Sequence, residues 1–156
     1  MMDKRIDRLL GILDKEEIPY QLQVFEQPAH HASQAAELLN CPIGAVVKSL
    51  VLIHPDKESF LVVLVSGKNQ LDFEKVARFT GVNVKMATPK EVIELTGFEV
   101  GAVPPFGVEG QTQTLIDQDL MVYDTVWGSA GSQTTLISLA PPNLKKLCEG
   151  QVVRIK

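Results

Sequence analysis

The sequence is poor in cysteine and has no apolar run long enough to cross a membrane. Its 156 residues include two cysteines, Cys41 and Cys148, which lie far apart and outside any C-x-x-C motif. This pattern indicates neither a disulfide framework nor a zinc site, and we expect both thiols to be buried. The longest apolar runs, residues 50–53 and 61–65, are far shorter than the roughly 18 to 20 residues of a membrane span. The first residues lack the apolar segment of a signal peptide, so we expect a cytoplasmic protein that does not contact a membrane.

Basic residues are missing from residues 91–144. All 15 Lys and Arg lie outside this stretch, which holds seven acidic residues. The rest of the chain carries 15 basic and 12 acidic side chains, a net charge of +3, against −4 for the whole chain. An anionic partner would be attracted by that remainder, unless the acidic residues only solvate one side of the molecule.

The composition is that of an ordinary globular protein. With 45% hydrophobic and 22% charged residues, the chain can bury an apolar core, and we expect it to fold as one domain over residues 1–156. No internal repeat, low-complexity run or linker divides it.

Hydrophobic periodicity and turn residues predict helices and strands that are interleaved along the chain. Helices are predicted over residues 3–17, 33–39, 71–79 and 89–97 and from Pro141 onward, with Ser33 as the N-cap of the second and Thr88 in a capping box before the fourth. Strands are predicted over residues 20–24, 45–53, 59–65, 82–86, 112–116, 121–127, 134–139 and 151–155. Because several neighbours are joined by tight turns, we expect an α/β fold of α+β type, in which helices flank a mixed, curved central β-sheet.

Lys48 stands alone in an apolar segment, residues 45–52. Strand alternation places it on the same face as Val46, Leu50 and Leu52. Because removing an ammonium group from water is costly, we expect an anion, carbonyl groups or a wet cleft beside it. The alternative is an edge position from which its charged end reaches solvent. We favour a functional site, although the segment lacks the glycine before lysine that a phosphate-binding loop requires.

A glycine- and proline-rich loop over residues 101–107 is the second candidate. Gly101 allows close approach of the backbone to a ligand, while Pro104 and Pro105 stiffen the turn. Rigid N–H groups in such a loop can stabilise an oxyanion. A tight connection between a helix and a strand uses similar residues, so a purely structural loop is the alternative interpretation.

The Ser-Ala-Gly segment at residues 129–131 follows a predicted strand and could place small polar groups beside a ligand. It lacks the first glycine of a nucleophile elbow. The histidines His30, His31 and His54 match no metal-binding spacing, and we expect them at the surface, with His30 and His31 able to border a cleft.

The order of these features resembles the YbaK and prolyl-tRNA synthetase editing-domain family. The resemblance covers nearly the whole chain and rests on the strand with Lys48, the G-x-x-x-P loop at residues 101–105 and the Ser-Ala-Gly segment at residues 129–131. Members of this family hydrolyse the ester that joins a wrong amino acid to a tRNA, without a metal and without a side-chain nucleophile.

The resemblance implies roles for single residues. Lys48 would lie near the terminal adenosine or its phosphate, and Gly101 with its loop would contact the aminoacyl carbonyl, so both are predicted to be catalytic. The predicted substrate-binding residues are His31, Ser33, Ala102, Val103, Pro104, Pro105, Ser129, Ala130 and Gly131. No metal ligand and no cofactor is expected.

The implied activity is that of a free-standing, trans-editing aminoacyl-tRNA deacylase. Its expected partners are the acceptor end of a mischarged tRNA and a prolyl-tRNA or other synthetase. Ser132 and Gln133 stand where cysteine-specific members carry basic residues, so alanine, serine or threonine is expected rather than cysteine. Two alternatives remain: a module of the same fold that binds aminoacyl-tRNA or a nucleotide without turnover, and a serine hydrolase that pairs Ser129 with a histidine.

Overall fold

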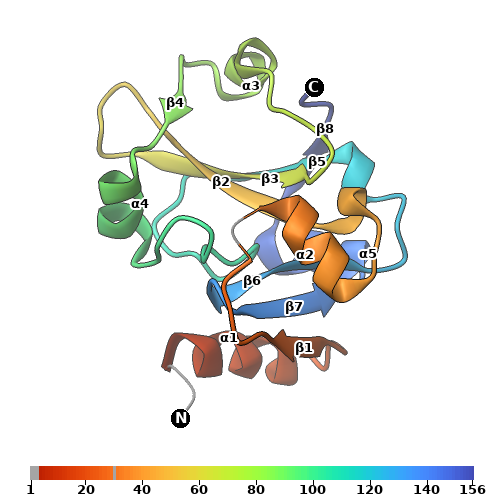
Figure 1. Cartoon of the computed structure of the whole chain (residues 1–156). Helices are drawn as coiled ribbons and strands as arrows, with labels where there is room; N and C mark the ends of the chain where they lie inside the picture. Colours follow the sequence, from red (N-terminus) through yellow and green to blue (C-terminus); the bar gives the residue numbers. More distant parts are fainter. Residues whose placement is uncertain (1–3, 30) are drawn as a thin grey trace.

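The computed structural model describes residues 4–29 and 31–156 (Figure 1). The helices are α1 (Lys4–Lys15), α2 (Ala32–Leu39), α3 (Phe73–Thr80), α4 (Pro89–Thr96) and α5 (Pro141–Cys148), with 3-10 turns η1 (Ile43–Ala45) and η2 (Gln118–Leu120). The strands are β1 (Gln21–Val24), β2 (Val47–Ile53), β3 (Phe60–Ser66), β4 (Lys85–Met86), β5 (Thr114–Asp117), β6 (Val126–Ser132), β7 (Thr135–Leu139) and β8 (Gln151–Val153).

The strands form two sheets. The larger has the order β4-β2-β3-β5-β8 and is mixed, because β2 pairs with β3 and β4 antiparallel while β5 pairs with β3 and β8 parallel. This confirms the predicted α/β class and mixed sheet, with β8 at the expected edge. The smaller sheet, β1-β7-β6, is antiparallel and was not predicted as a separate sheet. A parallel bridge between Val46 and Trp127 connects the start of β2 to β6.

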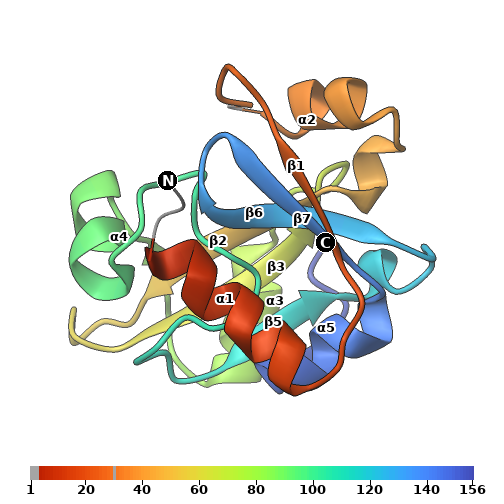
Figure 2. The same ribbon diagram turned by 90° about the horizontal axis from the view of Figure 1, so that it is seen from below.

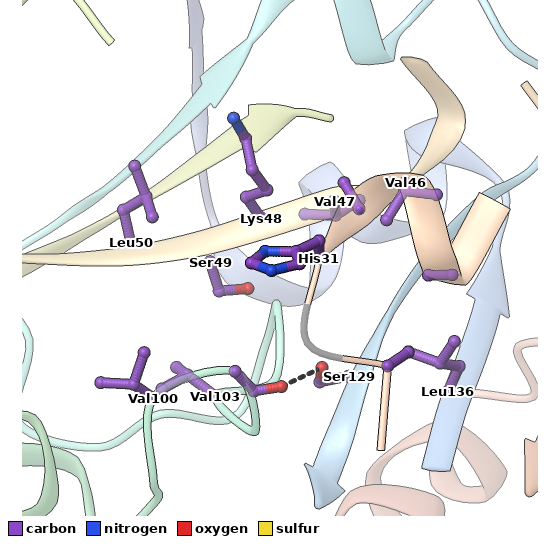
Figure 3. A pocket seen from close by; sticks show the side chains of 14 residues that line it. His31, Val46, Val47, Lys48, Ser49, Leu50, Val100, Val103, Ser129 and Leu136 are labelled. Atoms are coloured by element: carbon purple, nitrogen blue, oxygen red, sulfur yellow. Dashed lines mark hydrogen bonds between the residues drawn. The ribbon is translucent and has the colours of Figure 1, made fainter. Parts of the chain in front are cut away.

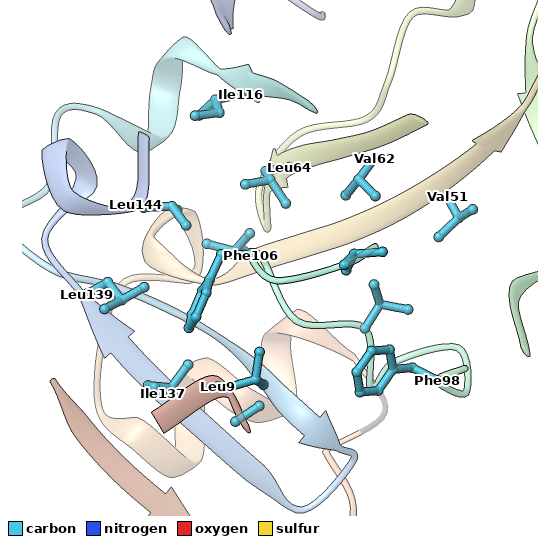
Figure 4. Close-up of a cluster of buried hydrophobic side chains, with 14 of the residues drawn as sticks. Leu9, Val51, Val62, Leu64, Phe98, Phe106, Ile116, Ile137, Leu139 and Leu144 are labelled. Carbon is cyan, nitrogen blue, oxygen red and sulfur yellow. The ribbon is translucent and has the colours of Figure 1, made fainter. Parts of the chain in front are cut away.

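The main core lies between the two sheets (Figure 4). Helix α1, which crosses the lower side of the molecule in Figure 1 and faces the viewer in Figure 2, contributes Leu9 and Leu13 to it. Strand β3 is buried along its whole length, with Val62 and Leu64 in this core and Val63 in a second cluster that includes Val76 of α3. Burial on both faces explains the unbroken apolar run of β3.

The strand predicted over residues 121–127 is wrong for most of its length, since β6 begins only at Val126. Val122 is 74% exposed, so its apolar side chain does not belong to a buried strand face. The Asp117 carboxylate accepts a hydrogen bond from the Asp119 N–H at 2.9 Å, which favours the turn η2 immediately before this segment. The Ser-Ala-Gly segment therefore lies within β6 instead of following a strand.

The N-cap of α2 is His31 and not Ser33. The His31 N–H donates to Gln34 Oε1 at 3.3 Å, as in a capping box, while Ser33 is an exposed residue of the first turn. The capping box predicted at Thr88 is confirmed, because the Thr88 side chain accepts from the Glu91 N–H and the helix ends at Gly97. No helix in the described part of the chain is long and apolar enough to span a membrane.

Both cysteines are only half-buried, whereas we expected buried thiols. Burial nevertheless raises the pKa of Cys148 to about 11. At pH 8 only about one Cys148 thiol in a thousand is then a thiolate, so we expect iodoacetamide to modify it far more slowly in the native protein than in urea. Mass spectrometry of tryptic peptides over time measures both rates. Equal rates in the two conditions would contradict this environment.

Candidate active site

A cavity of about 250 Å³ lies between the start of β2, the start of α2, the loop after α4 and strand β6 (Figure 3). It brings together five residues that the sequence analysis selected from distant segments: His31, Lys48, Gly101, Val103 and Ser129. The other lining residues, which the sequence analysis did not select, are Ala29, Ala32, Ala35, Val46, Val47, Ser49, Leu50, Val100 and Leu136.

One wall of the cavity is an unpaired stretch of the edge of β2. Strand β4 pairs only with Leu52 and Ile53, and the Val51 carbonyl accepts from the Ala87 N–H at 3.0 Å on the side away from β3. Backbone groups of alternate residues in an antiparallel strand point to the same side. The N–H and C=O of Ser49 therefore also point away from β3, beyond the end of β4, and are available to a ligand.

Lys48 lies at the rim of the cavity. Figure 3 shows its side chain and that of Ser49 leaving β2 on opposite sides, as strand alternation requires. The Lys48 Nζ donates to the Asn69 carbonyl at 2.5 Å, which is one of the partners expected for an ammonium in an apolar segment. Burial lowers the pKa of Lys48, and the charge of Asp117 opposes that shift.

The Asn69 carbonyl is held in place by a buried polar network. The Asn69 amide donates to Asp117 Oδ2 and to Asp119 Oδ2, each at 2.8 Å. Asp117 Oδ2 also accepts from the Ser66 N–H at 3.0 Å, and Asp117 is only 1% exposed. The position of the Lys48 ammonium is thus coupled to residues far away in the sequence that the motif analysis missed.

The loop after α4 supplies backbone donors. Pro104 and Pro105 have no N–H, and the Ala102 N–H donates to the Glu99 carbonyl at 2.9 Å. Within residues 101–105 this leaves the N–H groups of Gly101 and Val103, the two loop residues in this range that line the cavity. Gly101 has φ +85°, a left-handed conformation that glycine adopts without strain.

Ser129 fixes this loop to β6. Its hydroxyl donates to the Gly101 carbonyl at 2.6 Å, so its proton points at a backbone oxygen instead of a basic side chain. A nucleophilic serine needs a base as hydrogen-bond partner, and in the described part of the chain no histidine plays that role for Ser129. This geometry argues against the serine hydrolase alternative.

Several predicted substrate-binding residues do not line the cavity. Ala102, Pro104, Pro105, Ala130 and Gly131 are buried, and Ser33 is exposed on α2. Pro105 packs on the backbone of β6 so closely that a Cβ at position 128 would lie 3.0 Å from its Cγ. Of the motif at residues 101–105, only Gly101 and Val103 therefore line this cavity.

The histidines occupy different places. His31 is exposed and lines the cavity, whereas the His54 ring pairs with the Thr112 hydroxyl at 3.2 Å and lies outside the cavity lining. His30 lies outside the described residues. Within residues 4–29 and 31–156 no group of three His, Cys, Asp or Glu side chains is arranged to hold a metal ion.

The half-buried position of Lys48 predicts an early loss of its proton as the pH rises. Burial disfavours the charged form, so Lys48 should titrate below the ordinary lysine pKa of about 10.4. NMR of proteins with ¹³C-labelled lysine side chains, titrated from neutral to alkaline pH and assigned with Lys48→Arg, measures this directly. Titration at or above the ordinary value would show that the ammonium is not desolvated.

The fold and the cavity define a small α/β protein in which a glycine–proline loop, an open strand edge and a lysine surround one cavity. The model of the aminoacyl-tRNA editing domain matches residues 26–147. The chain therefore belongs to the aminoacyl-tRNA editing domain family, as the resemblance predicted.

Individual relatives agree with this assignment. The chain is 29% identical over 149 residues to EbsC of Enterococcus faecalis, named as a candidate Cys-tRNA(Pro)/Cys-tRNA(Cys) deacylase, covering 94% of this chain and 90% of the relative. It is 34% identical over 88 residues to a proline–tRNA ligase of Thermosipho africanus, covering 56% of this chain and 15% of the ligase. A crystal structure described as a candidate trans-editing enzyme for prolyl-tRNA synthetase superposes with a TM-score of 0.87 at 33% identity, covering 100% of this chain and 99% of that one.

Proposed function

We propose that this protein is a free-standing deacylase that hydrolyses the ester of a mischarged tRNA in trans, in the cytoplasm. The observation that supports this most is the cavity itself. In a chain of the editing-domain family, it is lined by Gly101 and Val103 of the loop after α4 and by Lys48 and Ser49 of β2.

The proposed reaction needs little chemical assistance, because an aminoacyl ester is already activated. The ester carbonyl accepts hydrogen bonds from the Gly101 and Val103 N–H groups, which stabilise the oxyanion as water adds to the carbonyl carbon. The ester C–O bond then breaks, and the ribose oxygen leaves as a hydroxyl with a proton that comes from the water. The neighbouring ribose hydroxyl can assist this transfer, while Lys48 binds the terminal adenosine or its phosphate and orients the ester.

The proposed substrate carries a small amino acid. Ala29, Ala32 and Ala35 line the cavity, whose limited volume suits alanine, serine or threonine. The name of EbsC supports cysteine instead. A pocket of this kind discriminates weakly between side chains that differ by one methyl or hydroxyl group. The choice among the four is therefore decided by experiment.

The proposed partners are the acceptor end of the mischarged tRNA and a prolyl-tRNA synthetase. The similarity to proline–tRNA ligases and to the trans-editing structure supports the second partner. A trans-acting deacylase would act on tRNAPro after its release from such a synthetase.

The proposed function is tested by following ester loss from alanyl-, seryl-, threonyl-, cysteinyl- and prolyl-tRNAPro. We expect selective hydrolysis of one mischarged species and no acceleration for prolyl-tRNAPro. Saturable binding of charged tRNA without ester loss above the rate in buffer would instead support the non-catalytic binding module.

A further inference from the structure

One polar group in the cavity has no role in the reaction described so far. Among the described residues, Ser49 Oγ is the one buried side-chain nitrogen or oxygen atom without a hydrogen-bond partner. Buried polar atoms are almost always paired, so an exception in a native protein requires an explanation. Ser49 lines the cavity, next in sequence to Lys48.

The Ser49 side chain points into the cavity. Figure 3 shows it on the side of β2 that faces Val103 and Ser129, opposite to the side from which Lys48 leaves the strand. The Val51 carbonyl, two residues further along β2, accepts from the Ala87 N–H on the side away from β3. Because alternate residues point their backbone groups to the same side, the Ser49 carbonyl also points to the unpaired edge of β2. A single residue thus offers two acceptor oxygens, one from its side chain and one from its backbone.

Two acceptors at one position suit a water molecule that acts as a nucleophile. Such a water must donate its hydrogens away from the ester so that a lone pair faces the carbonyl carbon. In the proposed reaction, the Gly101 and Val103 N–H groups lie on the loop across the cavity and donate hydrogen bonds to the oxygen of the ester carbonyl. The wall formed by β2 is then the side from which the water approaches.

We propose that Ser49 positions the attacking water, through its hydroxyl and its backbone carbonyl. The assignment rests on the proposed deacylase function and adds the group that orients the nucleophile. Ser49 forms no covalent bond to the substrate: the water oxygen bonds to the carbonyl carbon, and the water proton leaves with the ribose oxygen.

The test compares Ser49→Ala, Ser49→Thr and the control Ser59→Ala on the mischarged tRNA that the wild type hydrolyses fastest. Ser49→Ala should lower kcat by about 10- to 100-fold with little change in KM, because the water loses one of its two partners. Its melting temperature should not fall, because the hydroxyl has no protein partner to lose. Ser49→Thr keeps a hydroxyl and should restore most of the rate.

The control variant should show the opposite pattern. The Ser59 hydroxyl donates to Asp56 Oδ2 at 2.8 Å in the β2–β3 turn, outside the cavity lining. Ser59→Ala should therefore lose some stability and keep its activity.

Three results would overturn the assignment of Ser49 alone. The first is unchanged kcat in Ser49→Ala while the wild type is active, which leaves the deacylase function intact. The second is a change in KM or amino-acid preference alone, which would make Ser49 a ligand of the substrate. The third is a covalent acyl adduct on Ser49, detected by mass spectrometry. A wild type that hydrolyses no mischarged tRNA would overturn the proposed function itself, together with this assignment.

Discussion

Lys48→Ala is expected to lower kcat/KM for the mischarged substrate by about 100- to 1000-fold. Lys48 is one of the residues that line the cavity, and its ammonium is held by the Asn69 carbonyl at 2.5 Å. A preorganised charge in a partly desolvated site contributes far more than a mobile surface charge. Initial rates over a range of tRNA concentrations measure the loss.

Two further variants test whether the loss of activity is due to the charge of Lys48 and is specific to its position. Lys48→Arg keeps the charge but changes its shape, and it should recover only part of the activity. Lys90→Ala removes a lysine whose side chain is 86% exposed and pairs with Glu94 on α4, and it should leave the rate unchanged. Equal activity of Lys48→Ala and the wild type would remove Lys48 from the mechanism.

Asp117→Ala is expected to destabilise the fold by about 3 kcal/mol. Its carboxylate, buried at the end of β5, accepts from the N–H groups of Ser66 and Asp119 and from the Asn69 amide. The alanine would leave these donors without that partner in a buried site, where each unpaired group costs about 1 to 3 kcal/mol. Urea unfolding followed by circular dichroism measures the free energy of unfolding.

The same variant should also impair the site. Without Asp117 the Asn69 side chain keeps only its bond to Asp119, so the carbonyl that holds Lys48 becomes less fixed. Asp124→Ala, at an exposed position of the neighbouring segment, serves as the control and should be within about 0.5 kcal/mol of the wild type. A loss below about 1 kcal/mol for Asp117→Ala would show that the network does not stabilise the fold.

Local signals in the sequence were sufficient for most helices and strands. The capping box at Thr88, the apolar strands β2 and β3 and the final helix follow rules that involve only neighbouring residues. The pairing of β1 with β7 joins Gln21 to Ser138, and no local pattern reveals such a contact. The smaller sheet was therefore missed, although two of its three strands, β1 and β7, were predicted.

The site was predictable where a motif carries unusual residues. Lys48 was conspicuous because it is charged among apolar neighbours, and Gly101 because it belongs to a stiff glycine–proline loop. Ser49 is an ordinary residue for a strand, and its proposed role depends on an unpaired edge that only the sheet order shows. Asn69 could not be selected from the sequence either, since its hydrogen-bond partner Asp117 is 48 residues away.

The most direct test of the account is a single-turnover measurement with the protein in excess over mischarged tRNAPro. The half-life of each ester then reports binding and chemistry alone, because product release no longer matters. We predict that the wild type shortens the half-life of one small mischarged amino acid, releasing free amino acid and intact tRNA, and that Lys48→Ala restores the half-life towards that in buffer. Half-lives equal to those in buffer for every mischarged species, with charged tRNA demonstrably bound, would contradict the deacylase function.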